Sequence, residues 1–355
     1  MSSSAEEMRV SHSTLVQLGR AVFRAVGVPD ADADITSKSL VDADLRGVHS
    51  HGMQRLPWYV SRLQQGGTNV QPDVQVVEQG PSTGLIDGDG GLGQVVSHRA
   101  MQLAIQKSES NGIGCVAVRN SHHFGACGYW VRMAMPGRKI GIATTNGGCL
   151  MAPWGGRTPT TSNDPIGVAV PAGDLPPIVL DMATTIVAGG TLDLLARQGK
   201  KIPLDWALDR EGQPTDDPAS ARQGLILPIG QHKGYGLTVV FEILAAVLSG
   251  ANVGREVPPA TAIHQPMNVG HYFQVIDISR FLPVEVFEQR VAGFIQQIKS
   301  AQRMPGTKEI FLPGEIEHRK EQQYRRHGIP LHPTVVDELN LLATRLKITA
   351  KLELM

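Results

Sequence analysis

The stretch STGLIDGDGGLGQVV, residues 82–96, decides which class of α/β fold this sequence predicts. Within it, GDGGLG at 88–93 satisfies the GxGxxG pattern that holds a dinucleotide pyrophosphate in a Rossmann fold. A helix is predicted to follow, and Glu109 lies at a plausible distance along the chain for a ribose contact. These glycines either bind a dinucleotide or only form a turn.

The surroundings of this motif argue against a Rossmann fold. The fingerprint should follow a long buried strand inside a βαβ unit, whereas only STGLI precedes it, after the helix-rich residues 1–81. Asp87 and Asp89 would also place negative charge beside a pyrophosphate. Because such short motifs often match by chance, we interpret GDGGLG as a glycine-rich turn into a helix.

Outward from this turn, hydrophobic periodicity predicts helices before it and mixed elements after it. Helices are expected at 12–26, 30–45, 53–67, 95–110, 234–251 and 334–346. Strands are expected within 73–87 and at 114–120, 139–146, 167–173 and 177–184. This order indicates an α/β or α+β protein, in which 234–251 is the most apolar helix and is expected to be the most buried.

The composition favours a small-molecule partner. The formal net charge of the 355 residues is +0, which argues against a nucleic-acid or anionic-membrane surface. The sequence has no apolar run of about 18 residues that could cross a membrane, and MSSSAEEMRV does not resemble a signal peptide. Cys115, Cys127 and Cys149 form no disulfide or zinc pattern, so we expect a cytoplasmic protein.

Two short stretches contain paired histidines. RGVHSHGMQRLPWY, 46–59, carries His49 and His51, and NSHHFGACGYW, 120–130, carries His122 and His123. The second stretch follows a predicted strand, and catalytic groups are common at strand ends. A single histidine is more often a buried ring bonded to backbone, but two such clusters favour a functional site.

One interpretation of these clusters is a metal site. His49, His51 and one of His122 or His123 could bind a metal ion, with Asp181 as a carboxylate ligand. A metal-dependent hydrolase could be built in this way.

The other interpretation is proton transfer. Imidazole titrates near neutral pH and contributes roughly 10²–10⁴-fold as a general acid or base. Arg55 follows His51 by four residues, so a helix would place both on one face, and its planar guanidinium suits a carboxylate. A histidine beside a carboxylate-binding arginine describes the reduction of a 2-oxo acid.

Two further residues have alternative interpretations. Asp181 ends the predicted strand PIVLDMATT, 177–185, where it could orient a histidine or cap the next segment. Lys233 lies between glycines in GQHKGYGL, 230–237, at the start of the apolar helix. A cation among exposed amides there suits a phosphate or carboxylate, unless the glycines only serve packing and Lys233 points into solvent.

Together these stretches resemble the malate/L-lactate dehydrogenase family, which includes ureidoglycolate and sulfolactate dehydrogenases and cyclic-imine 2-carboxylate reductases. The resemblance follows the family order over roughly residues 10–340. The stretches that carry it are RGVHSHGMQRLPWYVSRLQQGG (46–67), SHHFGACGYW (121–130), APWGGR (152–157), VLDMATT (179–185), KKIPLDWALDREGQPTDDP (200–218), LPIGQHKGYGL (227–237) and FLPGE (311–315).

The resemblance implies site residues by position. His51 matches the proton-transfer histidine, with Ser50 and Asp181 completing a relay. His123 matches a second histidine, treated as the catalytic base in some members, and Arg55 would hold the substrate carboxylate. The residues that match cofactor contacts are Asp181, Met182, Ala183, Lys233, Gly314 and Glu315.

The resemblance also implies a non-Rossmann fold, with NAD or NADP on a mostly antiparallel sheet packed with helices, and a homodimer or larger assembly. We predict a helical domain of residues 1–75 and 315–355 and a cofactor domain of residues 76–314. The predicted activity is hydride transfer between NAD(P)H and C2 of a small 2-oxo or 2-hydroxy acid. Alternatives are a cyclic-imine or ketimine 2-carboxylate reductase and the metal-dependent hydrolase.

Three short elements depart from the family pattern. NGGCL, 146–150, replaces the usual small-hydroxyl element, and SNDP, 162–165, replaces a GTNP-like element. Gln231 stands where glycine is common. These changes bear on substrate identity and on cofactor geometry.

Overall fold

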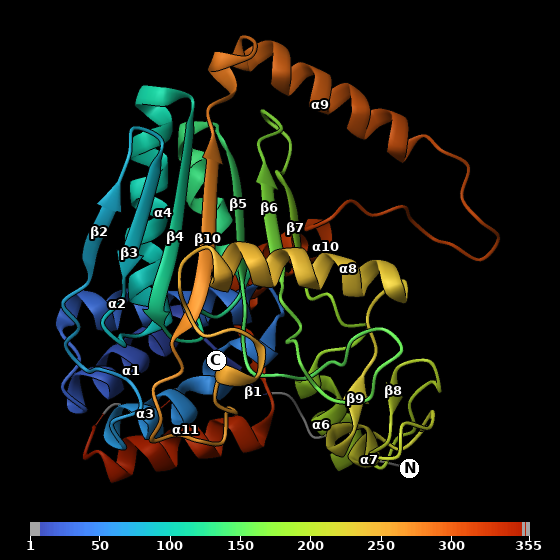
Figure 1. Ribbon diagram of the computed structural model, residues 1–355. Coiled ribbons are helices and arrows are strands. Elements are labelled where there is room, and N and C mark those ends of the chain that lie inside the picture. The colour runs from blue at the N-terminus through green and yellow to red at the C-terminus, as the bar shows by residue number, and fades with distance from the viewer. Residues whose placement is uncertain (1–7, 350–351, 353–355) are drawn as a thin grey trace.

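A seven-stranded mixed sheet, covered by helices, forms the centre of the protein (Figure 1). The structure is a computed structural model that describes residues 8–349 and 352. In sheet order, the strands are β2 (Gln75–Gln79), β3 (Thr83–Asp87), β4 (Ile113–Ser121), β10 (Val269–Ile276), β5 (Ile140–Thr145), β6 (Ile166–Val170) and β7 (Ile178–Met182). Only β3 and β4 pair in parallel, so the predicted mostly antiparallel α/β (α+β) fold is confirmed.

A helical layer lies against one end of the sheet. Its main elements are α1 (His12–Ala25), α2 (Asp30–Leu45), α3 (Leu56–Gln64) and α11 (Pro333–Arg345). Side chains such as Leu15, Phe23 and Leu339 are almost fully buried there, and each contributes about 1.5–3 kcal/mol by leaving water. The short strands β1 (Met8–Val10) and β11 (Ile329–Leu331) pair antiparallel, so segments from both ends of the chain meet in this layer.

The GDGGLG segment connects β3 to α4 (Gly93–Asn111), which leads into the parallel strand β4. A βαβ unit is therefore present, and the expectation that this motif lies outside one was wrong. The motif is nevertheless a turn into a helix, as predicted. A Cβ atom on Gly93 would overlap the carbonyl oxygen of His122, so the backbone of residues 122–123 covers the start of α4 where a pyrophosphate would lie.

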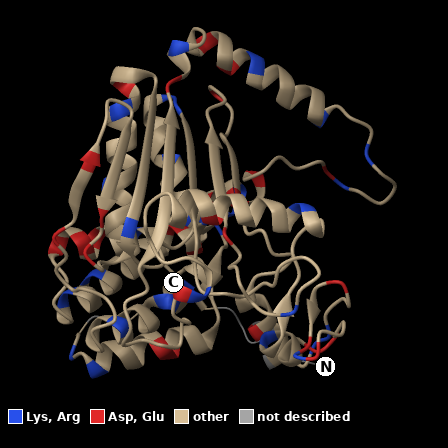
Figure 2. Cartoon of the chain, viewed as in Figure 1, with Lys and Arg blue, Asp and Glu red and all other residues tan. Residues whose placement is uncertain are grey.

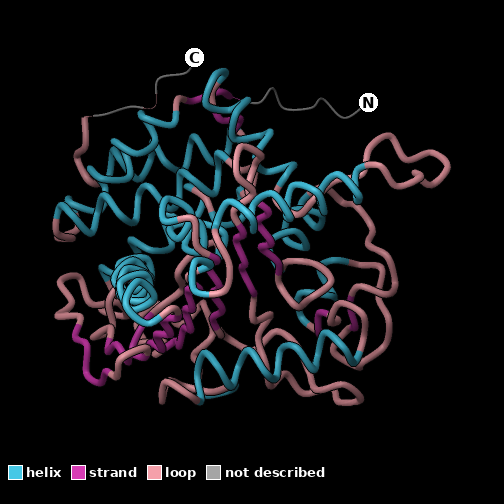
Figure 3. The backbone as a smooth tube through the Cα atoms, turned by 90° about the horizontal axis from the view of Figure 1, so that it is seen from above, coloured by secondary structure: helices cyan, strands magenta, loops and turns pink. Residues whose placement is uncertain are grey.

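Strand β10 was not predicted, although it is the central strand. It pairs with β4 on one side and β5 on the other. Its buried His271 makes hydrogen bonds of 2.7 Å to the hydroxyls of Ser121 on β4 and Thr145 on β5. Phe273 and Val275 point into the core beneath α4. Seen from above, the strands lie between helices on both faces (Figure 3).

Helix α8 (His232–Glu242) and the π-helical turn Ile243–Val247 form the apolar segment that we expected to be the most buried. That expectation was wrong. Its exposed apolar side chains, each 45–58% accessible, are Leu237, Val240, Ile243, Val247 and Leu248. The segment is apolar because one face packs on the sheet, while the other has no partner among the described residues of this single chain.

The first of the remaining helices and strands is packed in the core, and the others lie nearer the outside of the fold (Figure 1). These remaining elements are α5 (Cys127–Val131), α6 (Gly189–Arg197), α7 (Pro218–Gln223), α9 (Val284–Lys299), α10 (Glu315–His327), β8 (Ala207–Leu208) and β9 (Leu225–Ile226). In the view of Figure 2, both acidic and basic residues appear on α9, whereas α5 has no charged residue. Within the described part of the chain, no helix is long and apolar enough to cross a membrane.

Candidate active site

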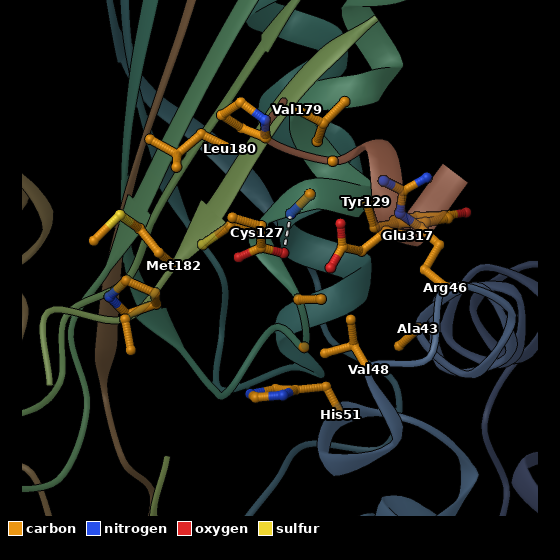
Figure 4. Close-up of a pocket in the computed structure, with 18 of the residues that line it drawn as sticks. Ala43, Arg46, Val48, His51, Cys127, Tyr129, Val179, Leu180, Met182 and Glu317 are labelled. Atoms are coloured by element: carbon orange, nitrogen blue, oxygen red, sulfur yellow. Dashed lines mark hydrogen bonds between the residues drawn. The ribbon is translucent and has the colours of Figure 1, made fainter. Parts of the chain in front are cut away.

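A cavity of about 430 Å³ lies between the helical layer and the β7 side of the sheet (Figure 4). Segments 42–51, 125–129, 163–165, 179–183 and 312–317 contribute to its wall. The predicted site residues among its lining are Ser50, His51, Asp181, Met182, Ala183 and Gly314. Folding therefore brings together residues from the HSHG, VLDMATT and LPGE stretches.

His51 and His123 stack at one end of this cavity. Their ring centroids are 5.4 Å apart and their planes differ by 19°. His51 Nδ1 lies 3.0 Å from the Ser50 hydroxyl, and His123 Nδ1 lies 2.6 Å from the hydroxyl of Tyr59. Each Nδ1 atom thus has a hydroxyl partner, which fixes the orientation of the ring. We call His51, His123, Tyr59 and Arg55 the histidine corner.

Both rings of the histidine corner are uncharged at neutral pH. Desolvation lowers the pKa of His51 to about 4, and the positive charge of Arg55 adds to the shift. Desolvation also lowers the pKa of His123 well below its usual value, with His51 and Arg55 contributing. Because the stacked rings repel each other when protonated, the pair can take up one proton far more readily than two.

Arg55 joins this corner through the backbone. Its Nε donates a hydrogen bond of 2.8 Å to the carbonyl of Ser50, which places the guanidinium beside both imidazoles. It does not line the cavity itself. The terminal nitrogens of its planar fork are suited to binding a carboxylate.

Asp44 holds the HSHG turn and was not identified from the sequence. Its buried carboxylate accepts hydrogen bonds from Met53 N at 2.7 Å and His49 Nδ1 at 2.8 Å. A Cβ on Gly52 would overlap this carboxylate, which explains the glycine after His51. His49 therefore supports the turn, and His51 faces the cavity.

Tyr59 was also missed, although the sequence contained a signal. It lies in α3, four residues after Arg55, which caps the start of that helix in a helical conformation, so the two residues fall on one face. Burial raises the pKa of its phenol, which stays protonated and hydrogen-bonded to His123. The fully buried carboxamide of Gln94, in the first turn of α4, lies beside the same phenol.

Asp181 lies in the cavity wall but is positioned by α5. Its Oδ2 accepts a hydrogen bond of 2.7 Å from Gly128 N (Figure 4). Desolvation raises the pKa of this carboxyl group, while Gly128 and Arg46 oppose the rise. Among the described residues, no hydrogen bond joins Asp181 to Ser50 or His51, so the relay implied by the family resemblance stays a prediction.

The LPGE turn packs tightly against β7. Gly314 has φ +83°, and a Cβ there would lie 2.7 Å from the carbonyl oxygen of Val179. Val179 N donates to Pro313 O at 3.0 Å. Glu315 points away from the cavity, because it pairs with Lys299 and accepts a hydrogen bond from Leu312 N.

Lys233 lies at the start of α8 and is not part of this cavity wall. It follows Gly230 and Gln231, both of which have positive φ angles, at 54° and 59°. Glycine adopts this conformation freely, whereas Gln231 is strained in it. The structure of this single chain therefore leaves the predicted cofactor contact of Lys233 as a prediction.

The metal-site interpretation finds no support in the structure. Within the described residues, no group of three or more His, Cys, Asp or Glu side chains is arranged to hold a metal ion. His49 bonds to Asp44, and His122 is buried with its Nδ1 3.5 Å from the guanidinium of Arg62. The proposed ligands therefore point to different partners.

The end of the cavity away from His51 carries most of its charge. Asp42, Arg46 and Glu317 line this region, which we call the acidic end (Figure 4). Val48, Val179 and Leu180 supply apolar wall, with Val48 near His51 and with Val179 and Leu180 on the opposite side of the cavity (Figure 4). The cavity thus combines apolar walls with a few polar groups, as small-molecule sites usually do.

Comparison with known proteins places the chain among dehydrogenases. A family profile described as malate/L-lactate dehydrogenase matches residues 10–340. The chain is 41% identical to malate dehydrogenase of Pyrococcus horikoshii over 96% of both chains. It is 31% identical to ureidoglycolate dehydrogenase (NAD(+)) of Escherichia coli K12, over 91% of this chain and 93% of the relative. It is 34% identical to (2R)-3-sulfolactate dehydrogenase (NADP(+)) of Chromohalobacter salexigens, over 92% and 95%.

Solved structures agree with these sequence matches. Sulfolactate dehydrogenase from Methanocaldococcus jannaschii has a TM-score of 0.91 and 38% identity, over 97% of this chain and 98% of that one. The Δ1-piperideine-2-carboxylate reductase of Pseudomonas syringae has a TM-score of 0.86 and 30% identity, over 94% and 99%. The fold is thus shared by enzymes that are named for hydroxy acids and for a cyclic imine.

Proposed function

The chain belongs to the malate/L-lactate dehydrogenase family, and from that premise we propose that it transfers a hydride between NAD(P)H and C2 of a small 2-oxo acid. The reverse reaction oxidises the matching 2-hydroxy acid. One observation carries the proposal: the stacked, uncharged rings of His51 and His123 lie beside Arg55, and His51 lines a cavity of about 430 Å³.

The bound nicotinamide would supply or accept the hydride. His51 would give or take the proton of the substrate oxygen, with Ser50 and Asp181 as its proposed relay. Arg55 would hold the carboxylate, and His123 would position the oxygen or share the proton. An uncharged imidazole suits the oxidation direction, since it can accept the hydroxyl proton at once. Protein around the corner excludes water and strengthens these contacts.

The cofactor would lie along the cavity, against segments 181–183 and 312–315. Glycines at 128 and 314 let the backbone approach closely there. We propose Asp181, Met182, Ala183, Gly314, Glu315 and Lys233 as cofactor-binding residues. Glu315 and Lys233 would act from outside the cavity wall, by holding the turn and by reaching in, respectively.

A ketimine or cyclic-imine 2-carboxylate reductase is the second candidate. The similarity to the Pseudomonas syringae reductase favours it, because an imine carboxylate needs the same arginine and the same proton donor. The substrate panel below separates the two, since only an oxo acid or only an imine would be turned over efficiently.

We also propose that two or more copies of the chain associate. Five large apolar side chains are exposed on α8 and the turn that follows it. Single apolar residues scattered over a surface are normal, whereas a larger exposed apolar patch marks an interaction site. The predicted two-domain division, at residues 1–75 with 315–355 and at 76–314, remains part of this proposal. Light scattering on the purified chain, with Val240→Asp and Leu248→Asp as a double variant, tests the association.

The test of function is a fluorescence titration of purified protein with NADH and separately with NADPH. A panel of 2-oxo acids, including oxaloacetate, pyruvate and sulfopyruvate, and one cyclic imine carboxylate would follow in the same cuvette. Binding of a cofactor and its oxidation by one substrate class is the expected result. If neither cofactor binds, the proposed function is wrong.

A further inference from the structure

We propose that Glu317 selects NAD over NADP, by accepting hydrogen bonds from the adenosine ribose and repelling a 2′-phosphate. This inference rests on the proposed function. Family membership leaves the choice open, since relatives are named for NAD(+) and for NADP(+). The charges around the acidic end decide between them.

The position of Glu317 is set by the LPGE turn. Gly314 begins α10, and Glu317 lies in its first turn and lines the cavity. It is on the same side as Arg46, away from His51 (Figure 4). Its charge is felt inside the cavity, because it helps to raise the pKa of Asp181. With the nicotinamide at His51, the adenosine half of the cofactor would extend toward this region.

The cations of this region already have carboxylate partners. Arg46, which is 7% exposed, pairs with Glu321 at 3.1 Å. Arg132 pairs with Asp42. At the rim, Lys299 and Arg319 both pair with Glu315. In the described part of the chain, these contacts leave no guanidinium at the acidic end without a carboxylate partner.

Glu317 itself has no ion pair among the residues that the structure describes. The uncompensated charge facing the cavity is therefore negative. Ribose hydroxyls donate hydrogen bonds to a carboxylate, whereas a 2′-phosphate carries up to two further negative charges and donates at most weakly. We expect NADPH to bind roughly 10- to 100-fold more weakly than NADH at low salt.

Lys320 is the cation that could oppose this selection. It follows Glu317 by three residues on α10, but its side chain lies over Gly47, with Nζ 2.7 Å from where a Cβ would stand. It does not line the cavity. If Lys320 swung inward, it could hold a phosphate, so the experiment includes Lys320→Ala.

Binding is measured by fluorescence titration with NADH and NADPH, without substrate, in wild type and variants. Wild type should bind NADH more tightly than NADPH. In Glu317→Gln, the ratio of the two dissociation constants should become smaller, mainly because NADPH binds more tightly. In Glu317→Lys, the preference should be reversed. Glu338→Gln, which removes the same charge from the exposed face of α11, should change nothing, as should Lys320→Ala. Competition by 5′-AMP against 2′,5′-ADP should show the same preference for the adenosine half alone.

The outcomes separate this inference from the proposed function. Equal or tighter NADPH binding in wild type, or an unchanged ratio in Glu317→Gln, would overturn the role of Glu317 while the dehydrogenase proposal stands. Binding of neither dinucleotide would overturn both. Because the selection is electrostatic, higher salt should reduce the wild-type ratio, and a ratio that does not respond to salt contradicts repulsion as its cause.

Discussion

The histidine corner and the acidic end belong to one cavity but treat charge in opposite ways. In the histidine corner, the rings of His51 and His123 are held neutral and bonded to hydroxyls. At the acidic end, Glu317 lines the cavity without an ion pair among the described residues, and Arg46 is paired with Glu321. Under the proposed function, proton transfer would thus occur where burial makes a new charge strongly felt, and cofactor recognition would occur where ion pairs are already present.

Among the variants that test this comparison, His51→Ala is expected to have the largest effect. It should lower kcat by about 10²–10⁴-fold, because a positioned general acid or base is lost, while NADH affinity stays close to wild type. Steady-state kinetics and cofactor titration together check this. His49→Asn, which can still donate to Asp44, should retain most activity; a comparable loss would mean that the corner depends on the turn and not on the His51 ring.

Arg55→Ala should have the next largest effect. Losing the guanidinium should raise KM for the acid about 10- to 100-fold with a smaller change in kcat, because the carboxylate contact exists before and during reaction. Arg55→Lys should recover only part of the loss, since a point charge cannot make two parallel hydrogen bonds. If the Arg55→Ala variant had the wild-type KM for the acid, another residue would have to bind the carboxylate.

The neutral histidines also predict how stability depends on pH. The pKa values of His51, His122 and His271 are lowered to about 4, 3 and 3, so between pH 6.5 and 4 the unfolded chain binds more protons than the folded one. The contribution of these histidines to the free energy of unfolding is therefore complete above pH 6.5. It decreases as the pH falls, by up to about 1.4 kcal/mol per pH unit for each histidine. Urea unfolding at pH 7, 6 and 5 measures how steeply the free energy of unfolding depends on pH. This dependence should be less steep in His271→Asn.

The smallest expected effect lies outside both ends of the cavity. Gln231→Gly should stabilise the chain by about 0.5–1 kcal/mol, because it relieves a positive φ of 59° while making the unfolded chain more flexible. Thermal unfolding measures it. If this variant also weakens cofactor binding, the strained turn before Lys233 takes part in recognition after all.

Much of the fold could be read from local patterns, and the exceptions have physical causes. The predicted helix at 30–45 matches α2, because its boundaries are set by local signals. Strand β10 was missed because His271 occupies an inward position in VGHYFQVI, so the alternation of apolar residues is interrupted. The apolar sequence of α8 could not distinguish a face that packs in the core from one left exposed.

The site was predicted in the same uneven way. Paired histidines and Arg55 are distinctive in the sequence, and folding brings His51, His123 and Arg55 together. Asp44 and Glu317 could not be identified, because one of several aspartates in a helix and a glutamate in the charged run EIEHRKEQQYRRH are both typical of solvated surfaces. Only tertiary packing shows that one carboxylate is buried and the other faces a cavity.

The central place of β10 has a consequence for how the protein is made. Strands β4 and β5 are synthesised long before β10, residues 269–276, which pairs with both of them. Until β10 is made, each of the two strands therefore has an unpaired edge. Strand β4 leads to segment 125–129 of the cavity wall, while β7, beyond β5, carries Asp181, so these two parts of the wall are also expected to come together late. Stalled nascent chains ending before residue 269 should stay protease-sensitive across the sheet, and longer ones should become resistant in a single step.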